Sequence, residues 1–143
     1  MAKTIKDLSA KINLFIDEVG TMEFTPEQAK IYAAFTKTKG RPISIRVSDP
    51  NNKIVSFKLD PTKRSDGPQH ILLKHYNSRI GQVTALEIIN MCEVIQMGKR
   101  DDSEASRLCY YLTKKENGVT YTLCLKLGKK DNYLKSFYSN RVF

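Results

Sequence analysis

The first forty residues carry apolar side chains at helical spacing. Between residues 4 and 19 these side chains recur every three or four positions, which predicts an amphipathic helix. A second helix start follows in "TPEQAKIYAAF", with Thr25 as N-cap, Pro26 at the first helical position and Gln28 completing a capping box. The pattern predicts a helical hairpin over residues 1–40.

After residue 40 the apolar positions alternate instead. The runs "RPISIRVS" (residues 41–48) and "KIVSFKL" (residues 53–59) are rich in β-branched residues, and the turn sequence "DPNN" joins them. A β-hairpin is therefore expected. Residues 60–69, "DPTKRSDGPQ", combine Pro, Gly and charged residues and predict an exposed loop.

The second half of the chain predicts one helix followed by a sheet. "TALEIINMCEVIQMG" has Thr84 as N-cap, Glu87 for a capping box and Gly98 at its end, which predicts one helix over residues 84–98. "GKRDDSEAS" is expected to be a polar loop. Three alternating segments then predict an antiparallel meander, at residues 107–114, 118–127 and 132–138. The expected fold is α+β, with N-terminal helices and a helix-bearing segment packed on a terminal antiparallel sheet.

The positive charge is concentrated after the predicted helical hairpin. Residues 1–40 carry six lysines and five acidic residues, a balance of +1, whereas residues 41–143 carry 18 Lys and Arg against 10 acidic residues, a balance of +8. Such a field favours a polyanionic partner such as a nucleic acid, although a solvated basic surface explains it as well. No apolar run approaches the roughly 20 residues of a membrane span, so no membrane contact is expected.

The three cysteines predict free thiols. Cys92, Cys109 and Cys124 are odd in number, widely spaced and set in apolar segments, and no Cys-x-x-Cys pair occurs. We expect small core residues in a reducing compartment rather than a disulfide or a zinc site.

Both histidines lie in "GPQHILLKHY". His70 and His75 are five residues apart, which places them about 140° apart on a regular helix, whereas a helical zinc pair needs a spacing of three or four. The segment has no acidic residue that could complete a zinc site, so neither a metal nor another cofactor is expected. Two roles remain: packing or capping within an amphipathic segment, or proton transfer.

A metal-free cleavage of RNA would use these residue types directly. Attack of the ribose 2′-hydroxyl on the adjacent phosphorus requires a general base, a general acid and fixed positive charge near the phosphorane-like transition state. Imidazoles can fill both proton-transfer roles near neutral pH, and Lys or Arg can supply the charge. RNA brings its own nucleophile, so DNA would not be cut in this way.

The order of motifs from residue 66 to 141 resembles a known group of nucleases. "HILLKH", a short loop, the capped "VTALEII" helix, strands around "CYYLTKKENGVTYTLCL" and a final "LKSFYSNR" are similar to the phage-associated barnase–EndoU–colicin–RelE-like (BECR fold) nuclease and toxin domains. In that family a helix with a Lys-His or Arg-His motif packs on an antiparallel sheet whose last strand ends in a Thr/Ser-x-Tyr pattern. The resemblance implies a BECR-like domain over residues 41–143, with residues 1–40 as an accessory hairpin that forms one compact unit with it.

The resemblance also implies a set of catalytic residues, and basic residues near them are candidates for RNA binding. The catalytic candidates are His70, Lys74, His75, Ser136 and Tyr138. The candidates for RNA binding are Lys63, Arg64, Arg79, Lys126 and Arg141. Ser136 and Tyr138 share a parity on the last predicted strand and should therefore face the same side.

The leading expectation is a metal-independent endoribonuclease toxin that cleaves RNA, with tRNA as one candidate, and leaves a 2′,3′-cyclic phosphate. Such a toxin would act in the cytoplasm of a bacterial cell, delivered from outside or phage-borne, and an immunity or antitoxin protein would hold it in check. Two alternatives stay open. One is a non-catalytic basic module that binds nucleic acid or protein during phage infection or defence. The other is an interaction protein whose leading helices bind a partner.

Overall fold

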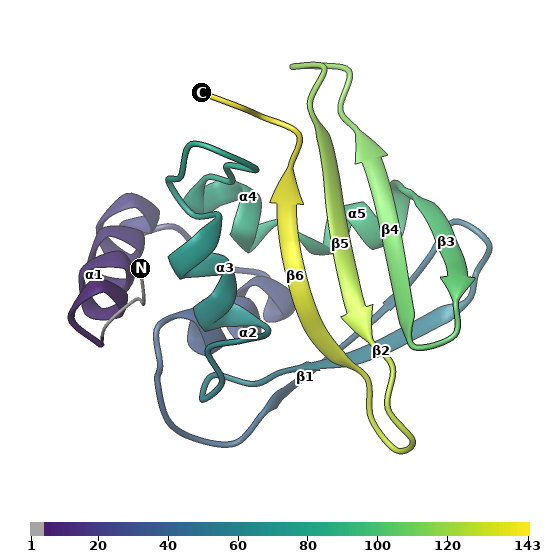
Figure 1. Cartoon of the computed structure of the whole chain (residues 1–143), viewed down its shortest axis with the longest axis horizontal. Coiled ribbons are helices and arrows are strands. Elements are labelled where there is room, and N and C mark those ends of the chain that lie inside the picture. The colour runs from purple at the N-terminus through teal and green to yellow at the C-terminus, as the bar shows by residue number, and fades with distance from the viewer. Residues whose placement is uncertain (1–4) are drawn as a thin grey trace.

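The computed structural model describes residues 5–143, and these residues form five helices and one six-stranded sheet (Figure 1). In chain order the elements are α1 (Ile5–Val19), α2 (Pro26–Phe35), β1 (Ile43–Ser48), β2 (Ile54–Leu59), α3 (Pro68–Lys74), α4 (Ala85–Ile89), α5 (Cys92–Met97), β3 (Lys99–Glu104), β4 (Arg107–Thr113), β5 (Thr120–Lys126) and β6 (Tyr133–Ser139). The predicted α+β class is confirmed. Thr4, where the first predicted helix begins, lies outside the described residues.

The sheet has the strand order β1-β2-β6-β5-β4-β3 and curls around α5 (Figure 1). The predicted hairpin of β1 and β2 and the predicted meander of β4, β5 and β6 are confirmed as antiparallel pairs. β2 and β6 run parallel and pair only at Lys58 and Tyr133. The buried Asp49, at the end of β1, accepts a hydrogen bond of 2.8 Å from the Tyr110 hydroxyl of β4, which brings the hairpin close to the other end of the sheet.

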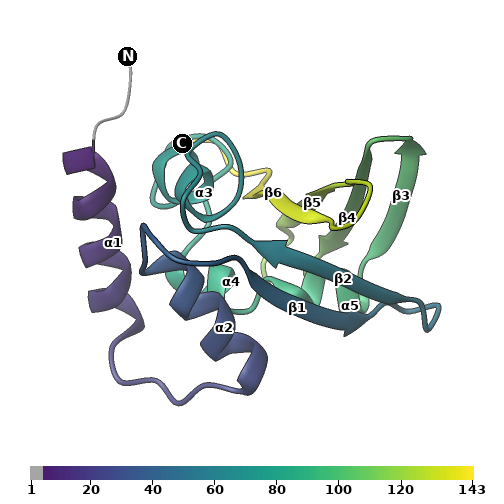
Figure 2. The same ribbon diagram turned by 90° about the horizontal axis from the view of Figure 1, so that it is seen from below.

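The hydrophobic core lies between the helices and the inner face of the sheet. Phe15 of α1 is fully buried and stacks near Tyr32 and Phe35 of α2, with ring centroids 6.0 and 5.8 Å apart. Its edge also meets the ring of Tyr76, directly after α3. Figure 2 shows α1 at the side of the molecule away from β3, and both α1 and α2 contact α3. The aromatic cluster therefore attaches the first two helices to the segment that carries both histidines.

The single helix predicted over residues 84–98 is wrong, because the chain breaks it into α4 and α5. The predicted capping box of Thr84 and Glu87 is present. The side-chain NH2 group of Asn90 donates a hydrogen bond of 3.0 Å to the Leu86 carbonyl. The side-chain oxygen of Asn90 accepts a hydrogen bond of 2.8 Å from the Gln28 side chain of α2. Such a side chain competes with the backbone hydrogen bonds that would continue the helix, and the helix ends here.

The polar loop predicted from "GKRDDSEAS" is also wrong, because Lys99–Glu104 forms the edge strand β3, which pairs antiparallel with β4. Gly98 permits this tight entry from α5. A Cβ at this position would lie 2.1 Å from the Val94 carbonyl oxygen and 2.6 Å from that of Tyr111. The loop expected at residues 60–69 is exposed only over residues 62–65, and it ends early because α3 begins at Pro68.

The expectation of three free thiols is wrong for two of them. Cys109 of β4 and Cys124 of β5 stand directly opposite each other in the strand register and form a disulfide, whereas Cys92 is buried and free. The disulfide removes the basis for inferring a reducing compartment. Among the described residues, no helix has the length and apolar character needed to cross a lipid bilayer.

Candidate active site

The helix α3 lies along the part of the β6 edge that β2 leaves open (Figure 1). Backbone hydrogen bonds attach the chain to β6 on both sides of this helix. Before α3, the Gly67 amide donates a hydrogen bond of 2.9 Å to the Lys135 carbonyl. After α3, the Gly81 carbonyl accepts a hydrogen bond of 3.1 Å from the Ser139 amide. Both glycines have a positive φ, of 78° and 69°, a conformation that other residues rarely adopt. The two attachments fix α3 against the last strand.

A cleft of about 500 Å³ opens between α3 and the outer face of β4, β5 and β6. It contains all five catalytic candidates proposed from sequence: His70, Lys74, His75, Ser136 and Tyr138. The first three come from α3 and its C-terminal end and the other two from β6, about sixty residues later. Folding therefore brings the histidine segment and the final strand together.

The two imidazoles are neighbours because the helix ends between them. α3 stops at Lys74, and His75 is its C-cap with φ −120° and ψ −29°. The ring centroids of His70 and His75 lie 5.5 Å apart and nearly perpendicular, so the 140° separation expected on a regular helix does not apply. Among residues 5–143, no group of three or more His, Cys, Asp or Glu side chains is placed to hold a metal ion.

His75 is packed closely on two sides. Its ring centroid lies 5.3 Å from that of Tyr138, and Gly81 approaches its other side. A Cβ at Gly81 would lie 3.0 Å from His75 Nδ1, so this position has room only for glycine unless the ring moves. The Nδ1 atom is buried and has no hydrogen-bond partner. Gly81 thus limits the position of the imidazole, and the Nδ1 atom of this ring makes no hydrogen bond.

A bulge in β6 turns two successive side chains into the cleft. Cys124 of β5 faces Ser136, but the next residue, Leu125, faces Leu134, so Lys135 is an extra residue on β6. Lys135 and Ser136 both line the cleft, while Leu134 on the other side of the bulge is in the core. Ser136 is 8% exposed, and its Oγ is buried without a partner. Bulges often redirect side chains next to active sites.

The electrostatics of the cleft keep both imidazoles neutral at pH 7. Burial, the neighbouring His70 and Lys74 lower the pKa of His75 to about 4, although the backbone of Ile80 opposes the shift in part. Burial and then Lys74 lower the pKa of His70; Lys135 adds to this shift and Asp66 opposes it. A neutral imidazole can accept a proton, so His75 has the protonation state that a general base requires.

The five predicted RNA-binding residues do not all face the cleft. Arg64 borders a second groove, which also contacts His70 and Lys74. Lys63 and Lys126 line a separate hollow, where Lys63 lies over the Tyr133 ring and Lys126 lies 3.9 Å from Asp66. Arg79 is exposed and is not part of the cleft lining.

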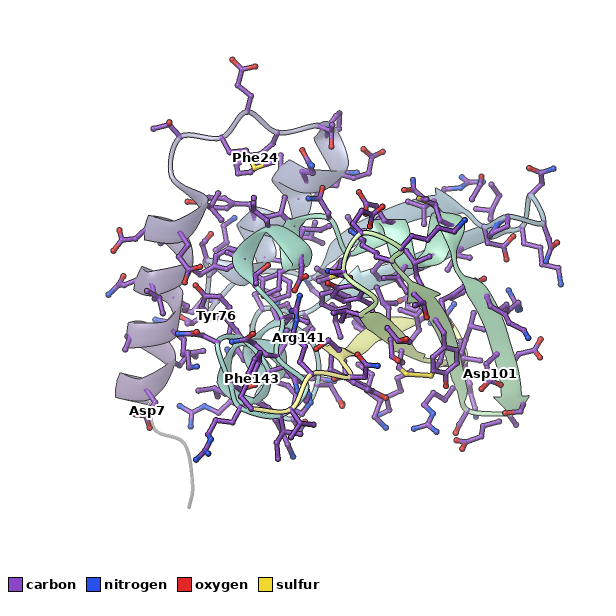
Figure 3. All side chains as sticks on the ribbon, turned by 90° about the horizontal axis from the view of Figure 1, so that it is seen from above. Asp7, Phe24, Tyr76, Asp101, Arg141 and Phe143 are labelled. Carbon is purple, nitrogen blue, oxygen red and sulfur yellow. A yellow bond between two sulfur atoms is a disulfide. The ribbon has the colours of Figure 1, made fainter. Side chains whose placement is uncertain are left out.

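Arg141 lines the cleft, but its guanidinium is engaged elsewhere. It donates to both carboxylate oxygens of Glu87 at 2.7 and 2.8 Å, and to the Gln82 carbonyl and the Tyr121 hydroxyl at 3.1 Å each. Figure 3 shows Arg141 between the last strand and the helical side of the molecule. Because binding phosphate would require giving up this ion pair, we leave Arg141 out of the proposed phosphate contacts.

Sequence reasoning missed two cations of the cleft, Lys135 and Arg107. Alternation along β6 assigns Lys135 to the face opposite Ser136, and only the bulge changes this. Arg107 begins β4 and pairs with Glu104 at 2.8 Å on the surface. No local motif marks either residue, so the signal is the strand register alone.

The low pKa of His75 predicts a pH-dependent stability. The unfolded chain takes up a proton at this residue below about pH 6.5, whereas the folded chain resists protonation until about pH 4. The free energy of unfolding should therefore fall by about 2 kcal/mol from this group between pH 6.5 and 4, after a discount for solvent screening. Urea denaturation at a series of pH values, for the wild type and His75→Leu, measures the difference. Parallel curves for the two proteins would contradict the assignment.

Comparison with protein-family models, curated proteins and solved structures gives no match for this chain. The chemistry of the cleft is therefore the basis on which a function can be assigned.

Proposed function

We propose that this protein is a metal-independent endoribonuclease whose active site is the cleft between α3 and β6. One observation carries the proposal. Among the described residues, His75 Nδ1 and Ser136 Oγ are the buried side-chain polar atoms without a hydrogen-bond partner, and both residues line this cleft. Leaving such an atom unpaired costs about 1–3 kcal/mol each, and a polar ligand would offset that cost. The site thus has the properties of one built to bind a polar group.

The neighbouring charges favour an anion as that group. The side chain of Lys74 is exposed at the rim of the cleft, and Lys135 is partly buried beside Ser136. Both can stabilise the charge that develops on the phosphoryl oxygens, and Ser136 Oγ and the Tyr138 hydroxyl can donate hydrogen bonds to the same oxygens. A phosphodiester fits this set of groups.

The proposed reaction uses the two imidazoles in turn. Neutral His75 takes the proton from the ribose 2′-hydroxyl while the 2′-oxygen forms a bond to phosphorus. The bond from phosphorus to the 5′-oxygen breaks, and His70, in the protonated form that it reaches below its lowered pKa, gives its proton to that oxygen. The products are a 2′,3′-cyclic phosphate and a free 5′-hydroxyl, and no oxidant, metal or other reactant enters. Burial, Lys74 and Lys135 lower the pKa of His70 overall, and the acid role falls to it because Asp66 opposes this shift and favours the charged form.

The arrangement of elements also supports a BECR-like assignment for residues 41–143. The strands β6, β5, β4 and β3 are consecutive neighbours, with α3 and its Lys74–His75 motif beside β6. The last strand contains the Ser-x-Tyr pattern at residues 136–138. By the same resemblance we propose a toxin that acts on RNA inside a bacterial cell, with tRNA as a candidate substrate and an immunity or antitoxin protein as its partner.

The test is a cleavage assay in EDTA with total tRNA and single-stranded DNA as substrates. We expect discrete tRNA fragments ending in a 2′,3′-cyclic phosphate and intact DNA. The pH dependence of kcat/KM should be bell-shaped, with an acid limb near pH 4 from His75 and an alkaline limb below pH 6.5 from His70. Intact tRNA at high protein excess, with salt-sensitive binding retained, would support the alternative of a basic binding module instead.

A further inference from the structure

The outer face of the sheet continues beyond the cleft, from β6 across β5 to β4. In Figure 1 this face is turned toward the viewer, with α5 behind it, and no helix or strand of residues 5–143 lies in front of β4 or β5. Residues directly opposite each other on neighbouring strands point to the same face, so the register identifies the rows of this face. In one row Tyr138 faces Thr122, and Thr122 faces Tyr111. Because Tyr138 lines the cleft, Tyr111 lies on the same face two strands away.

Tyr111 combines an accessible ring with a fixed orientation. This residue is 38% exposed, whereas Thr122, between the two tyrosines, is short and buried. The Tyr111 hydroxyl donates a hydrogen bond of 3.3 Å to Asp101 of β3, and the Asp101 carboxylate accepts a second one of 3.0 Å from the Ser103 amide. Because its hydroxyl is already held, the Tyr111 side chain loses little further freedom when a planar ligand stacks on its ring.

The neighbouring row connects the strand of Tyr111 to the cleft. Cys109, two residues before Tyr111, forms the disulfide with Cys124, which lines the cleft and faces Ser136 in the register. Tyr111 and Tyr138 are separated by two strand spacings, about 10 Å between their Cα atoms. The distance from the Tyr111 ring to the cleft is therefore set by a paired and covalently linked part of the sheet.

The two imidazoles give the cleft a direction. The helix α3 runs alongside β6 in the same direction, so His70 lies toward Lys135 and His75 packs against Tyr138. In the proposed reaction His75 takes the proton of the 2′-hydroxyl, and His70 gives a proton to the 5′-oxygen. The nucleotide that supplies the 2′-hydroxyl therefore lies at the Tyr138 end of the cleft, and the leaving nucleotide lies at the Lys135 end.

We propose that the ring of Tyr111 stacks on the base of the nucleotide that supplies the 2′-hydroxyl. This inference rests on the proposed ribonuclease function and adds a base-binding residue to it. The row from Tyr138 to Tyr111 leads outward from the end of the cleft at which that nucleotide lies. Aromatic side chains on an open sheet bind the bases of single-stranded RNA, because every base has a π-face. A base stacked within a duplex has both faces covered, so the substrate is single-stranded at this nucleotide.

The test uses a hexanucleotide with a single ribonucleotide among deoxynucleotides, which can be cleaved at one bond only. In a second substrate a hydrogen atom replaces the base of that ribonucleotide, and the 2′-hydroxyl is kept. The wild-type kcat/KM should fall about tenfold on loss of this base, the order expected for one stacked base. A third substrate lacks the base of the following nucleotide instead and should lose less. A larger loss with the third substrate would overturn the assignment of Tyr111 to the nucleotide that supplies the 2′-hydroxyl.

Replacement of Tyr111 by leucine removes the ring. For the intact substrate kcat/KM should fall about tenfold, and loss of the base should then have no further effect, because the two changes remove the same interaction. Tyr111→Phe keeps the ring and should retain most of the wild-type kcat/KM. The matched control is Tyr133→Leu, at a partly exposed tyrosine of β6 that lines the separate hollow of Lys63 and Lys126. Urea denaturation verifies that each variant is folded.

Binding of the all-deoxy hexanucleotide, which cannot be cleaved, separates the two proposals. Loss of the base at the same position should raise the wild-type Kd about tenfold and leave the Kd of Tyr111→Leu unchanged. If the wild type cleaves RNA but loss of the base has the same effect in the wild type and in Tyr111→Leu, the stacking role of Tyr111 is refuted. If no RNA is cleaved but binding depends on the base only when Tyr111 is present, the stacking role stands and the ribonuclease proposal fails.

Discussion

Replacement of His75 by alanine is expected to lower kcat for RNA cleavage by about a thousandfold. Loss of a general base removes a factor of about 10²–10⁴, and no other imidazole packs against both Gly81 and Tyr138. The Nδ1 atom of His75 is buried without a partner, so its removal also relieves an unfavourable contact. The free energy of unfolding at pH 7 should therefore change by less than about 1 kcal/mol.

The combination of lost activity and kept stability is what separates a catalytic role from a packing role. Single-turnover cleavage and urea denaturation on the same preparation measure the two quantities, and Lys30→Ala, at an exposed lysine of α2 that does not line the cleft, serves as the reference variant. A packed core histidine would show the reverse pattern, a large loss of stability and activity lost only in proportion to the unfolded fraction. That outcome would remove His75 from the proposed mechanism.

Replacement of Arg141 by alanine is expected to lower the free energy of unfolding by about 3–4 kcal/mol. The side chains of Arg141 and Glu87 are only 19% and 14% exposed, and the Tyr121 hydroxyl donates to the same carboxylate. Burial raises the pKa of Glu87, but the hydrogen bonds from Arg141 and Tyr121 outweigh it and lower the pKa overall. Without Arg141 the carboxylate stays buried without a counter-charge, which is the costly case for a buried ion pair.

The matched control for this prediction is Arg107→Ala. Arg107 also pairs with a glutamate at 2.8 Å, but the two side chains are 40% and 58% exposed. An exposed pair of this kind contributes about 0–1 kcal/mol. Urea denaturation at pH 7 compares the two variants. Equal losses would show that the contacts of Arg141 with Glu87 contribute no more than a surface pair does.

Local signals in the sequence predicted much of the fold. The capping boxes at Thr25 and Thr84 start helices as predicted, since each depends on residues only three apart. The alternating run around Val47 is a strand, because alternation records burial on one face, and the alternating run around Leu123 is a strand that is buried on both faces. The break at Asn90 could not be predicted in this way, since it depends on a contact with Gln28, sixty-two residues earlier.

The five catalytic candidates of the cleft could be named from the sequence, but the geometry of the cleft and two of its cations could not be predicted from it. The segment from His70 to His75 could be recognised from the sequence as a candidate for proton transfer. The distance of 5.5 Å between the two ring centroids, however, depends on where α3 ends. The contribution of Lys135 depends on a bulge, which no parity rule anticipates. The disulfide was accessible in principle: counting outward from the turn of the predicted hairpin places Cys109 opposite Cys124.

The strand β3 was missed because every side chain in "KRDDSE" is polar. β3 is one of the two edges of the sheet, and its outer backbone groups have no strand beside them. An exposed edge is a template for pairing with another molecule, and a dense row of charges makes such pairing unfavourable. The composition that conceals this strand from pattern analysis therefore protects the protein from aggregation through that edge.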